Sequence, residues 1–200
     1  MNYLEALNQY LFLKINAASG TQWWIIDLAT LIAEDMIYLI PVLLIALWLW
    51  GGESRRGLAL KICAVTLLSL GLNQVVGLLL PHPRPFVLGL GQLWLTHAAD
   101  PSFPSDHATV FASACICLLT GKELRLAIAT LVVGLCVAWS RVYLGVHFPL
   151  DMLGAAFIAA VASAAVAPLW SKAGTATTLF AQRCYRFAMC YPITRGWVRL

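Results

Sequence analysis

The sequence predicts an all-α membrane protein, a polytopic bundle of five to six transmembrane helices. Hydrophobic residues make up 61% of the 200 residues and charged residues only 11%, whereas a soluble domain carries about 25% charged residues. A chain of this length has too much surface for its volume to hide so many apolar side chains from water. Several apolar runs are also long enough to cross a bilayer as helices. The composition therefore argues against a soluble enzyme, a disordered chain and a nucleic-acid-binding module.

The N-terminal segment, residues 1–35, is expected to lie apart from the main membrane bundle. Residues 3–15 have amphipathic character, while residues 23–33 are apolar but contain Asp27 and end before an acidic pair. We expect an interfacial or re-entrant pair of helices here. A sixth full crossing and a merely long first span are the alternatives.

Five apolar runs predict the membrane crossings of a transmembrane domain over residues 36–171. The first run ends in Trp48 and Trp50, aromatic residues of the kind that anchor a helix at a membrane interface. The five predicted crossings are Met36–Trp50, Ile62–Pro81, Ala108–Gly121, Leu124–Trp139 and Met152–Ser171. Residues 172–200 then form a basic tail, which we expect to lie on anionic headgroups at the cytoplasmic surface.

Basic residues collect at one end of this predicted bundle. With five crossings they all fall on one face, which the positive-inside rule makes cytoplasmic. They are Arg55, Arg56, Lys61, Lys122, Arg125, Lys172, Arg183, Arg186, Arg195 and Arg199. The opposite, outer face receives the loop of residues 81–105, the turn of residues 142–150 and all four histidines.

Three clusters of polar residues lie at the outer ends of the crossings. The first contains Arg84 in a proline-rich segment, the second runs from Pro104 to His107, and the third joins Arg141, His147 and Asp151. Ionisable residues at such depths are costly and usually serve a function. Helix packing would bring the three clusters together in one shallow pocket.

The residue types in these clusters suit phosphoryl transfer. Arg84 and Arg141 carry planar guanidinium groups that match phosphate oxygens better than lysine does. Ser105 and the backbone N–H groups of the helix that follows add neutral donors. Two histidines can supply a nucleophile and an acid for the leaving group. Asp151, four residues after His147, can accept a hydrogen bond that fixes the imidazole tautomer.

Each of these residues also has a simpler explanation. Asp106 can act only as a helix cap, and the arginines can anchor helix ends at the interface. His82 and His97 are expected to be ordinary loop residues. The six cysteines show no spacing typical of a zinc site, and no carboxylate cluster suits a metal ion, so we expect no metal and no cofactor.

Three motifs together resemble the signature of the type 2 phosphatidic acid phosphatase family in order and spacing. They are Arg84-Pro85, Pro104-Ser105-x-His107 and Ser140-Arg141-x5-His147-x3-Asp151. The resemblance covers the chain from about Met36 to Trp170. Within that family the sequence is most similar to the short bacterial undecaprenyl-diphosphatases, through the stretch His97–His107 and the ending Gly196–Arg199.

The resemblance implies an α-helical membrane enzyme with a haloperoxidase-like core. Such an enzyme removes phosphate from lipids without a metal, through a phosphohistidine. By position, it implies that His147 is the nucleophile, Asp151 its orienting partner and His107 the general acid. The implied phosphate-binding residues are Arg84, Arg141, Ser105 and Asp106, the last through its backbone N–H.

Two positions depart from the family pattern. Gly77 stands where the first motif usually opens with a lysine, and Asp106 stands where the second motif usually has glycine. One cationic phosphate contact is therefore missing, and His82 is a candidate to replace it. The extra carboxylate of Asp106 is unfavourable beside phosphate unless it points away or caps the helix.

The function that the resemblance implies is hydrolysis of undecaprenyl diphosphate to undecaprenyl phosphate and inorganic phosphate, which recycles the carrier lipid of cell-wall peptidoglycan synthesis. The alternatives are a phosphatidylglycerol phosphate or phosphatidic acid phosphatase, a lipid phosphotransferase and, from another class, a non-catalytic anion transporter. The expected partners are the polyprenyl diphosphate substrate and the bilayer, with no nucleic acid and no obligate protein partner. The expected location is the bacterial inner membrane, with the active site facing the periplasm.

Overall fold

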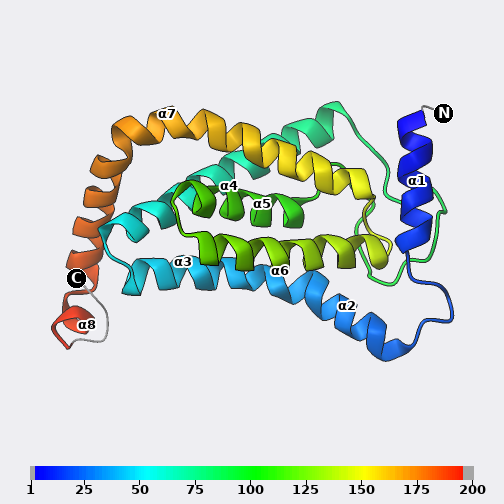
Figure 1. Ribbon diagram of the computed structural model, residues 1–200, viewed down its shortest axis with the longest axis horizontal. Helices are drawn as coiled ribbons and strands as arrows, with labels where there is room; N and C mark the ends of the chain where they lie inside the picture. Colours follow the sequence, from blue (N-terminus) through cyan, green and yellow to red (C-terminus); the bar gives the residue numbers. More distant parts are fainter. Residues whose placement is uncertain (1–2, 196–200) are drawn as a thin grey trace.

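The computed structural model describes residues 3–195, and within that range it consists of helices and connecting loops, without strands. Figure 1 shows the long helices lying roughly side by side, with the first helix across one end of the bundle. The helices are α1 (Tyr3–Ile15), α2 (Trp23–Asp35), the 3-10 turn η1 (Met36–Tyr38), α3 (Leu39–Trp50), α4 (Glu53–Leu79), α5 (Asp106–Thr120), α6 (Leu124–Tyr143), α7 (Pro149–Ala188) and α8 (Cys190–Thr194). The protein is thus an all-helical, multi-pass membrane protein.

The first crossing begins at Trp23, earlier than the predicted crossing Met36–Trp50. Helix α2 continues through η1 into α3, and residues 23–50 form one apolar span of 28 residues. Residues 23–35 are therefore the first half of a long apolar span, which matches the alternative of a long first span and differs from the interfacial or re-entrant pair. Pro41 explains the tight turn between the halves, because it has no N–H for the carbonyl four residues earlier and its ring crowds that carbonyl.

Helix α1 is too short to cross a bilayer and lies against the outer ends of α6 and α7. The side chain of Asn8 accepts a hydrogen bond from the backbone N–H of Leu150 at 3.0 Å. The ring of Phe12 packs edge-on against Phe148, with centroids 5.3 Å apart. Helix α1 therefore braces the turn between α6 and α7.

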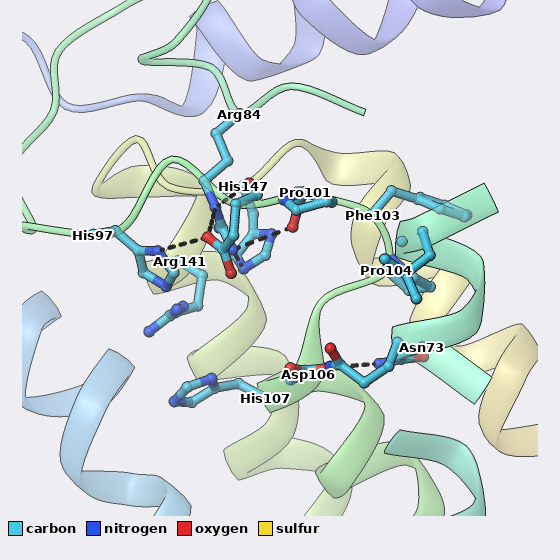
Figure 2. A pocket seen from close by; sticks show the side chains of 14 residues that line it. Asn73, Arg84, His97, Pro101, Phe103, Pro104, Asp106, His107, Arg141 and His147 are labelled. Atoms are coloured by element: carbon cyan, nitrogen blue, oxygen red, sulfur yellow. Dashed lines mark hydrogen bonds and ion pairs between the residues drawn. The ribbon is translucent and has the colours of Figure 1, made fainter. Parts of the chain in front are cut away.

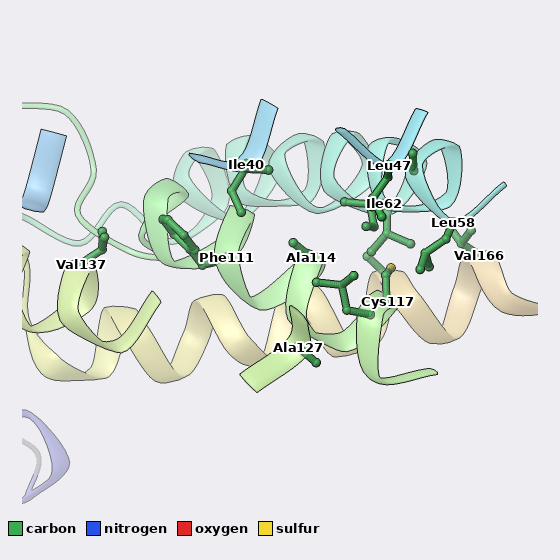
Figure 3. Packing of buried hydrophobic residues seen from close by; sticks show 14 residues of the cluster. Ile40, Leu47, Leu58, Ile62, Phe111, Ala114, Cys117, Ala127, Val137 and Val166 are labelled. Carbon is green, nitrogen blue, oxygen red and sulfur yellow. The ribbon is translucent and has the colours of Figure 1, made fainter. Parts of the chain in front are cut away.

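Helix α5 lies at the centre of the bundle and packs against α4, α6 and α7 (Figure 1). Its apolar side chains, among them Phe111 and Leu118, form the main core with Ile62 of α4 and Val137 of α6 (Figure 3). Gly134 allows α6 to approach closely, because a Cβ there would lie 2.8 Å from the Cβ of Phe111. With only 15 residues, α5 is shorter than its neighbours, so its first turn lies at the floor of a cavity.

Helix α7 extends well beyond the predicted crossing. It runs for 40 residues to Ala188 and changes direction in its orange part in Figure 1. Pro168 lies inside the helix, where it removes one backbone hydrogen bond and favours a bend. Residues 172–188 of the expected tail are therefore a continuation of α7, while Trp197, Arg199 and the ending Gly196–Arg199 lie outside the described residues.

Candidate active site

A cavity of about 210 Å³ lies at the outer end of the bundle. Its walls come from the last turns of α4, the loop between α4 and α5, the first turn of α5 and the end of α6 (Figure 2). The lining residues are Asn73, Gln74, Gly77, Leu78, Arg84, His97, Asp100, Pro101, Phe103, Pro104, Asp106, His107, Arg141 and His147. All three predicted clusters contribute to this one cavity.

His147 is positioned by a sharp turn between α6 and α7. Gly145 has a φ of 86°, a left-handed conformation that favours glycine, and a Cβ there would collide with the carbonyl oxygen of Gln92. Pro149 then occupies the first turn of α7, where its missing N–H costs no helical hydrogen bond. The turn returns the chain so that His147, only 2% exposed, faces the cavity.

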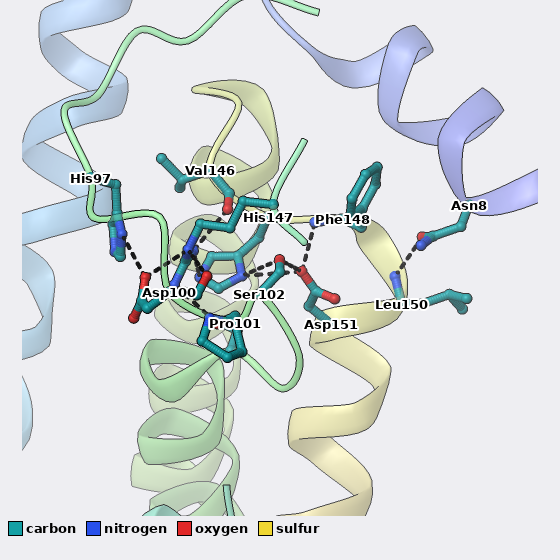
Figure 4. Close-up of polar contacts among 12 residues, drawn as sticks. Asn8, His97, Asp100, Pro101, Ser102, Val146, His147, Phe148, Leu150 and Asp151 are labelled. Atoms are coloured by element: carbon teal, nitrogen blue, oxygen red, sulfur yellow. Dashed lines mark hydrogen bonds and ion pairs between the residues drawn. The ribbon is translucent and has the colours of Figure 1, made fainter. Parts of the chain in front are cut away.

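The Asp151 carboxylate orients the His147 ring through its Nδ1. One carboxylate oxygen, Oδ2, lies 3.1 Å from His147 Nδ1 and accepts hydrogen bonds from the Phe148 backbone N–H at 2.8 Å and from the Ser102 hydroxyl (Figure 4). A carboxylate cannot donate when ionised, so Nδ1 carries the proton and Nε2 keeps its lone pair. Burial lowers the pKa of His147 below its ordinary value, against the opposing effect of Asp151, and so favours the neutral ring.

The Arg84 side chain links the loop between α4 and α5 to the turn that carries His147. Its Nε donates to the Asp100 carboxylate at 3.0 Å, and its Nη1 donates to the Val146 carbonyl oxygen at 2.8 Å. The same Nη1 lies 3.2 Å from His147 Nε2. Burial raises the pKa of Asp100, but the hydrogen bond and charge of Arg84, together with a backbone hydrogen bond and His97, lower it below its ordinary value, so this carboxylate is ionised at neutral pH. Arg84 is therefore fixed beside the free nitrogen of His147.

Two further donors, on Arg141 and Ser105, have no acceptor within the part of the chain that the structure describes. Arg141, at the end of α6, is 3% exposed and lines the cavity, and its Nε has no hydrogen-bond partner among residues 3–195. The hydroxyl of Ser105, fully buried at the N-terminus of α5, likewise has none in that range, although Ser105 lies behind the lining residues Pro104 and Asp106 and does not itself line the cavity. Buried donors without acceptors are costly. Together with the positive end of α5, they suit an oxyanion.

The first turn of α5 carries His107 and Asp106 on the cavity wall (Figure 2). The Asp106 carboxylate accepts a hydrogen bond from the side-chain amide of Asn73 at 2.8 Å, and the same amide nitrogen lies 2.9 Å from the Thr109 hydroxyl. The carboxylate is therefore tied to α4 and complements the helix dipole.

The structure separates the two loop histidines, both of which were expected to be ordinary loop residues. His82, the candidate replacement for the missing lysine, does not line the cavity, because its Nε2 lies 3.3 Å from the Glu5 carboxylate and its ring packs on Phe148. His97, expected as an ordinary loop residue, does line it, with its ring centroid 6.4 Å from that of His147.

Sequence reasoning also missed Ser102, Asp100 and Asn73. Ser102 and Asp100 belong to the stretch His97–His107 that carried the closer family resemblance, and this was the available signal. Asn73 gave no signal, because its role depends on the packing of α4 against α5. In residues 3–195, no group of three or more His, Cys, Asp or Glu side chains is arranged to hold a metal ion.

A multi-pass helical bundle with a buried His–Asp pair and two arginines at one cavity defines a class of membrane proteins that act on oxyanions. The chain belongs to the PAP2 superfamily, whose profile matches residues 58–175. It is therefore a membrane phosphatase.

Two curated relatives are similar over most of the chain. One is YbjG of Escherichia coli (strain K12), named provisionally as an undecaprenyl-diphosphatase, with 42% identity over 98% of this chain and 99% of YbjG. The other is the undecaprenyl-diphosphatase BcrC of Bacillus subtilis (strain 168), with 30% identity over 78% of this chain and 80% of BcrC.

A solved structure shares the fold. It is the crystal structure of a transmembrane PAP2 type phosphatidylglycerolphosphate phosphatase from Bacillus subtilis, with a TM-score of 0.62 and 22% identity. The match covers 86% of this chain and 88% of that chain.

Proposed function

We propose that the protein hydrolyses undecaprenyl diphosphate to undecaprenyl phosphate and inorganic phosphate through a phosphohistidine on His147. The observation that carries this proposal is the buried His147 ring, with Nδ1 held by Asp151 and Nε2 beside Arg84 at the cavity. The names of YbjG and BcrC support the choice of lipid. We assign catalysis to the transmembrane domain, residues 36–171.

In the first step, His147 Nε2 attacks the terminal phosphorus, and the bond from that phosphorus to the bridging oxygen breaks. Arg84 Nη1 exchanges its contact with Nε2 for a phosphate oxygen as the substrate binds. Arg141, Ser105 and the N–H groups at the start of α5, including that of Asp106, then stabilise charge on the transferring phosphoryl group. His107 protonates the departing oxygen, and the lipid monophosphate leaves.

In the second step, water attacks the phosphohistidine and His107 accepts a proton from it. The P–N bond breaks, inorganic phosphate leaves, and His147 returns to its neutral form. Asp151 keeps the proton on Nδ1 throughout, so that Nε2 alone takes part. A monophosphate is an easier leaving group than an alkoxide, which favours the diphosphate as substrate.

The protein is proposed to lie in the bacterial inner membrane with the cavity facing the periplasm. The exposed basic residues Arg55, Lys122 and Arg125 lie at the ends of helices opposite the cavity, which the positive-inside rule makes cytoplasmic. We expect no obligate protein partner, because every group in the two steps comes from this chain or from water.

The test is phosphate release by the purified protein in detergent with EDTA. The substrates are undecaprenyl diphosphate, phosphatidylglycerol phosphate and phosphatidic acid at equal mole fraction in the micelles. We expect the highest kcat/KM for the diphosphate and, after rapid alkaline quenching, an acid-labile phosphoenzyme that is absent from His147→Ala. A preference for either glycerolipid would overturn the substrate, and turnover surviving in His147→Ala would overturn the nucleophile.

A further inference from the structure

His97 lines the cavity but has no part in the two steps above. It lies in the loop between α4 and α5, with about a quarter of its side chain exposed, at the cavity that His107 and His147 share. Figure 2 shows its ring on the same side of the cavity as Arg141. A histidine held beside the reacting groups needs an explanation.

The loop fixes both the orientation and the tautomer of His97. Its Nδ1 lies 3.1 Å from the Ala98 carbonyl oxygen and 3.5 Å from the Asp100 carboxylate (Figure 4). Both neighbours are acceptors, so Nδ1 carries the proton and Nε2 is the free nitrogen. This arrangement parallels the His147–Asp151 pair, in which a carboxylate also holds Nδ1.

The charges around His97 make its protonation depend on a bound anion. Burial lowers the pKa of His97, and the nearby charges of Arg84 and Arg141 lower it further, while the Ala98 carbonyl and Asp100 oppose them. The ring is therefore neutral at neutral pH without substrate. A diphosphate brings several negative charges to the cavity, and these stabilise a proton on Nε2, which then donates to a phosphate oxygen.

The position of His97 suits the phosphate that remains with the lipid. In-line attack places the leaving group on the side of the terminal phosphorus that faces away from His147. The ring centroid of His97 lies 6.4 Å from that of His147, so its Nε2 can reach an oxygen of a diphosphate that extends away from His147. A lipid monophosphate has only an alkyl chain at that place.

We propose that His97 is a specificity-determining residue that binds the leaving phosphate of a lipid diphosphate and so favours diphosphates over monophosphates. This inference rests on the proposed function. Asp100 then has two tasks, since the same carboxylate oxygen accepts from Arg84 Nε and faces His97 Nδ1.

The test compares two substrates with the same chain, farnesyl diphosphate and farnesyl monophosphate, in the full-length protein in detergent. For His97→Ala we expect kcat/KM for the diphosphate to fall roughly 10- to 100-fold, the effect of losing a charged hydrogen bond. We expect kcat/KM for the monophosphate to change little, and this activity also reports the folded fraction in the same sample. His97→Gln, which keeps one donor but cannot be charged, should show an intermediate loss on the diphosphate.

Thr96→Ala is the matched control, because Thr96 is the exposed neighbour in the same loop and does not line the cavity. It should leave both substrates unaffected. Losses of equal size on both substrates in the His97 variants, or no loss on either, would overturn the inference. If the parent protein fails to hydrolyse undecaprenyl diphosphate in the same detergent, the proposed function itself is wrong.

Discussion

The two ends of the bundle each bury an arginine, and their surroundings are opposite in kind. Arg56 at the inner end is 2% exposed, and Arg141 at the outer end is 3% exposed. The Nε of Arg56 donates to the Trp48 carbonyl oxygen at 2.9 Å, and its guanidinium carbon lies 5.8 Å from the Trp48 ring and 5.3 Å from the Tyr185 ring. The Nε of Arg141 has no acceptor among residues 3–195 and faces a cavity.

The difference shows that burial of a charge does not by itself mark a functional site. The aromatic neighbours of Arg56 come from α3 and α7, so this arginine joins three helices and serves the fold. Arg141 has its donors directed where a substrate can supply the acceptor. The two ends therefore differ in whether the protein itself provides a hydrogen-bond acceptor for the Nε of the buried arginine.

Replacing each buried arginine by lysine, which keeps the charge, should give the largest difference in kcat between the two ends. In Arg141→Lys we expect kcat to fall about 10²- to 10³-fold, because an ammonium cannot reproduce the planar guanidinium at the transferring phosphate. Arg56→Lys should keep kcat close to that of the parent. The measurement is phosphate release per folded protein, and equal losses in the two variants would contradict the division between them.

Removing the Ser102 hydroxyl should have a smaller effect at the outer end. Ser102→Ala takes one hydrogen bond from the Asp151 carboxylate while leaving the His147 and Phe148 contacts in place. We expect kcat to fall roughly 10-fold, as is common for a residue that supports a catalytic ligand. Ser171→Ala is the control, because the Ser171 hydroxyl donates to the Pro168 carbonyl oxygen within α7, and a similar loss there would deny Ser102 a positioning role.

At the inner end we expect stability to change and catalysis to persist. Arg56→Leu removes a hydrogen bond and two ring contacts, which together contribute about 2 kcal/mol or more. The midpoint of thermal unfolding in detergent should fall by several degrees, while kcat of the folded protein stays unchanged. An unchanged midpoint would show that the aromatic contacts contribute little.

The smallest effect on activity is expected from single cysteine substitutions that show on which side of the membrane each end of the bundle lies. Gly20 and Gly52 are exposed, and a Cβ at either position meets no atom within 4 Å. Gly20→Cys lies at the cavity end and Gly52→Cys at the end with Arg56, and both should keep full activity. In spheroplasts an impermeant thiol reagent should label only Gly20→Cys above the parent background, and the reverse pattern would invert the topology.

The sequence predicts most of the groups that the structure brings together at the cavity, because the motifs fix their spacing. His147 and Asp151 are separated by one turn at the start of α7, so that local geometry alone brings them together. The path of the loop between α4 and α5 was not predictable in this way. Which of His82 and His97 turns inward depends on contacts with α1, such as the Glu5 carboxylate.

The length of the first span was also difficult to predict, because it depends on helix packing. Glu34 and Asp35 suggested the end of a helix, but both are exposed and Ala33 beside them is fully buried, so the helix continues past the acidic pair. Hydropathy along the chain does not show which face of a helix is covered by its neighbours.

The shortness of α5 has a consequence for kinetics. At about 1.5 Å per residue, its 15 residues span roughly 22 Å, less than the hydrocarbon thickness of a bilayer. We therefore expect its first turn, which carries His107, to lie below the membrane surface, so that a lipid substrate lowers its headgroup to the cavity while its hydrocarbon chain stays in the bilayer. Encounter is then a search in two dimensions. The turnover rate should follow the surface mole fraction of the lipid and fall when inert detergent or phospholipid dilutes it, even at constant bulk concentration.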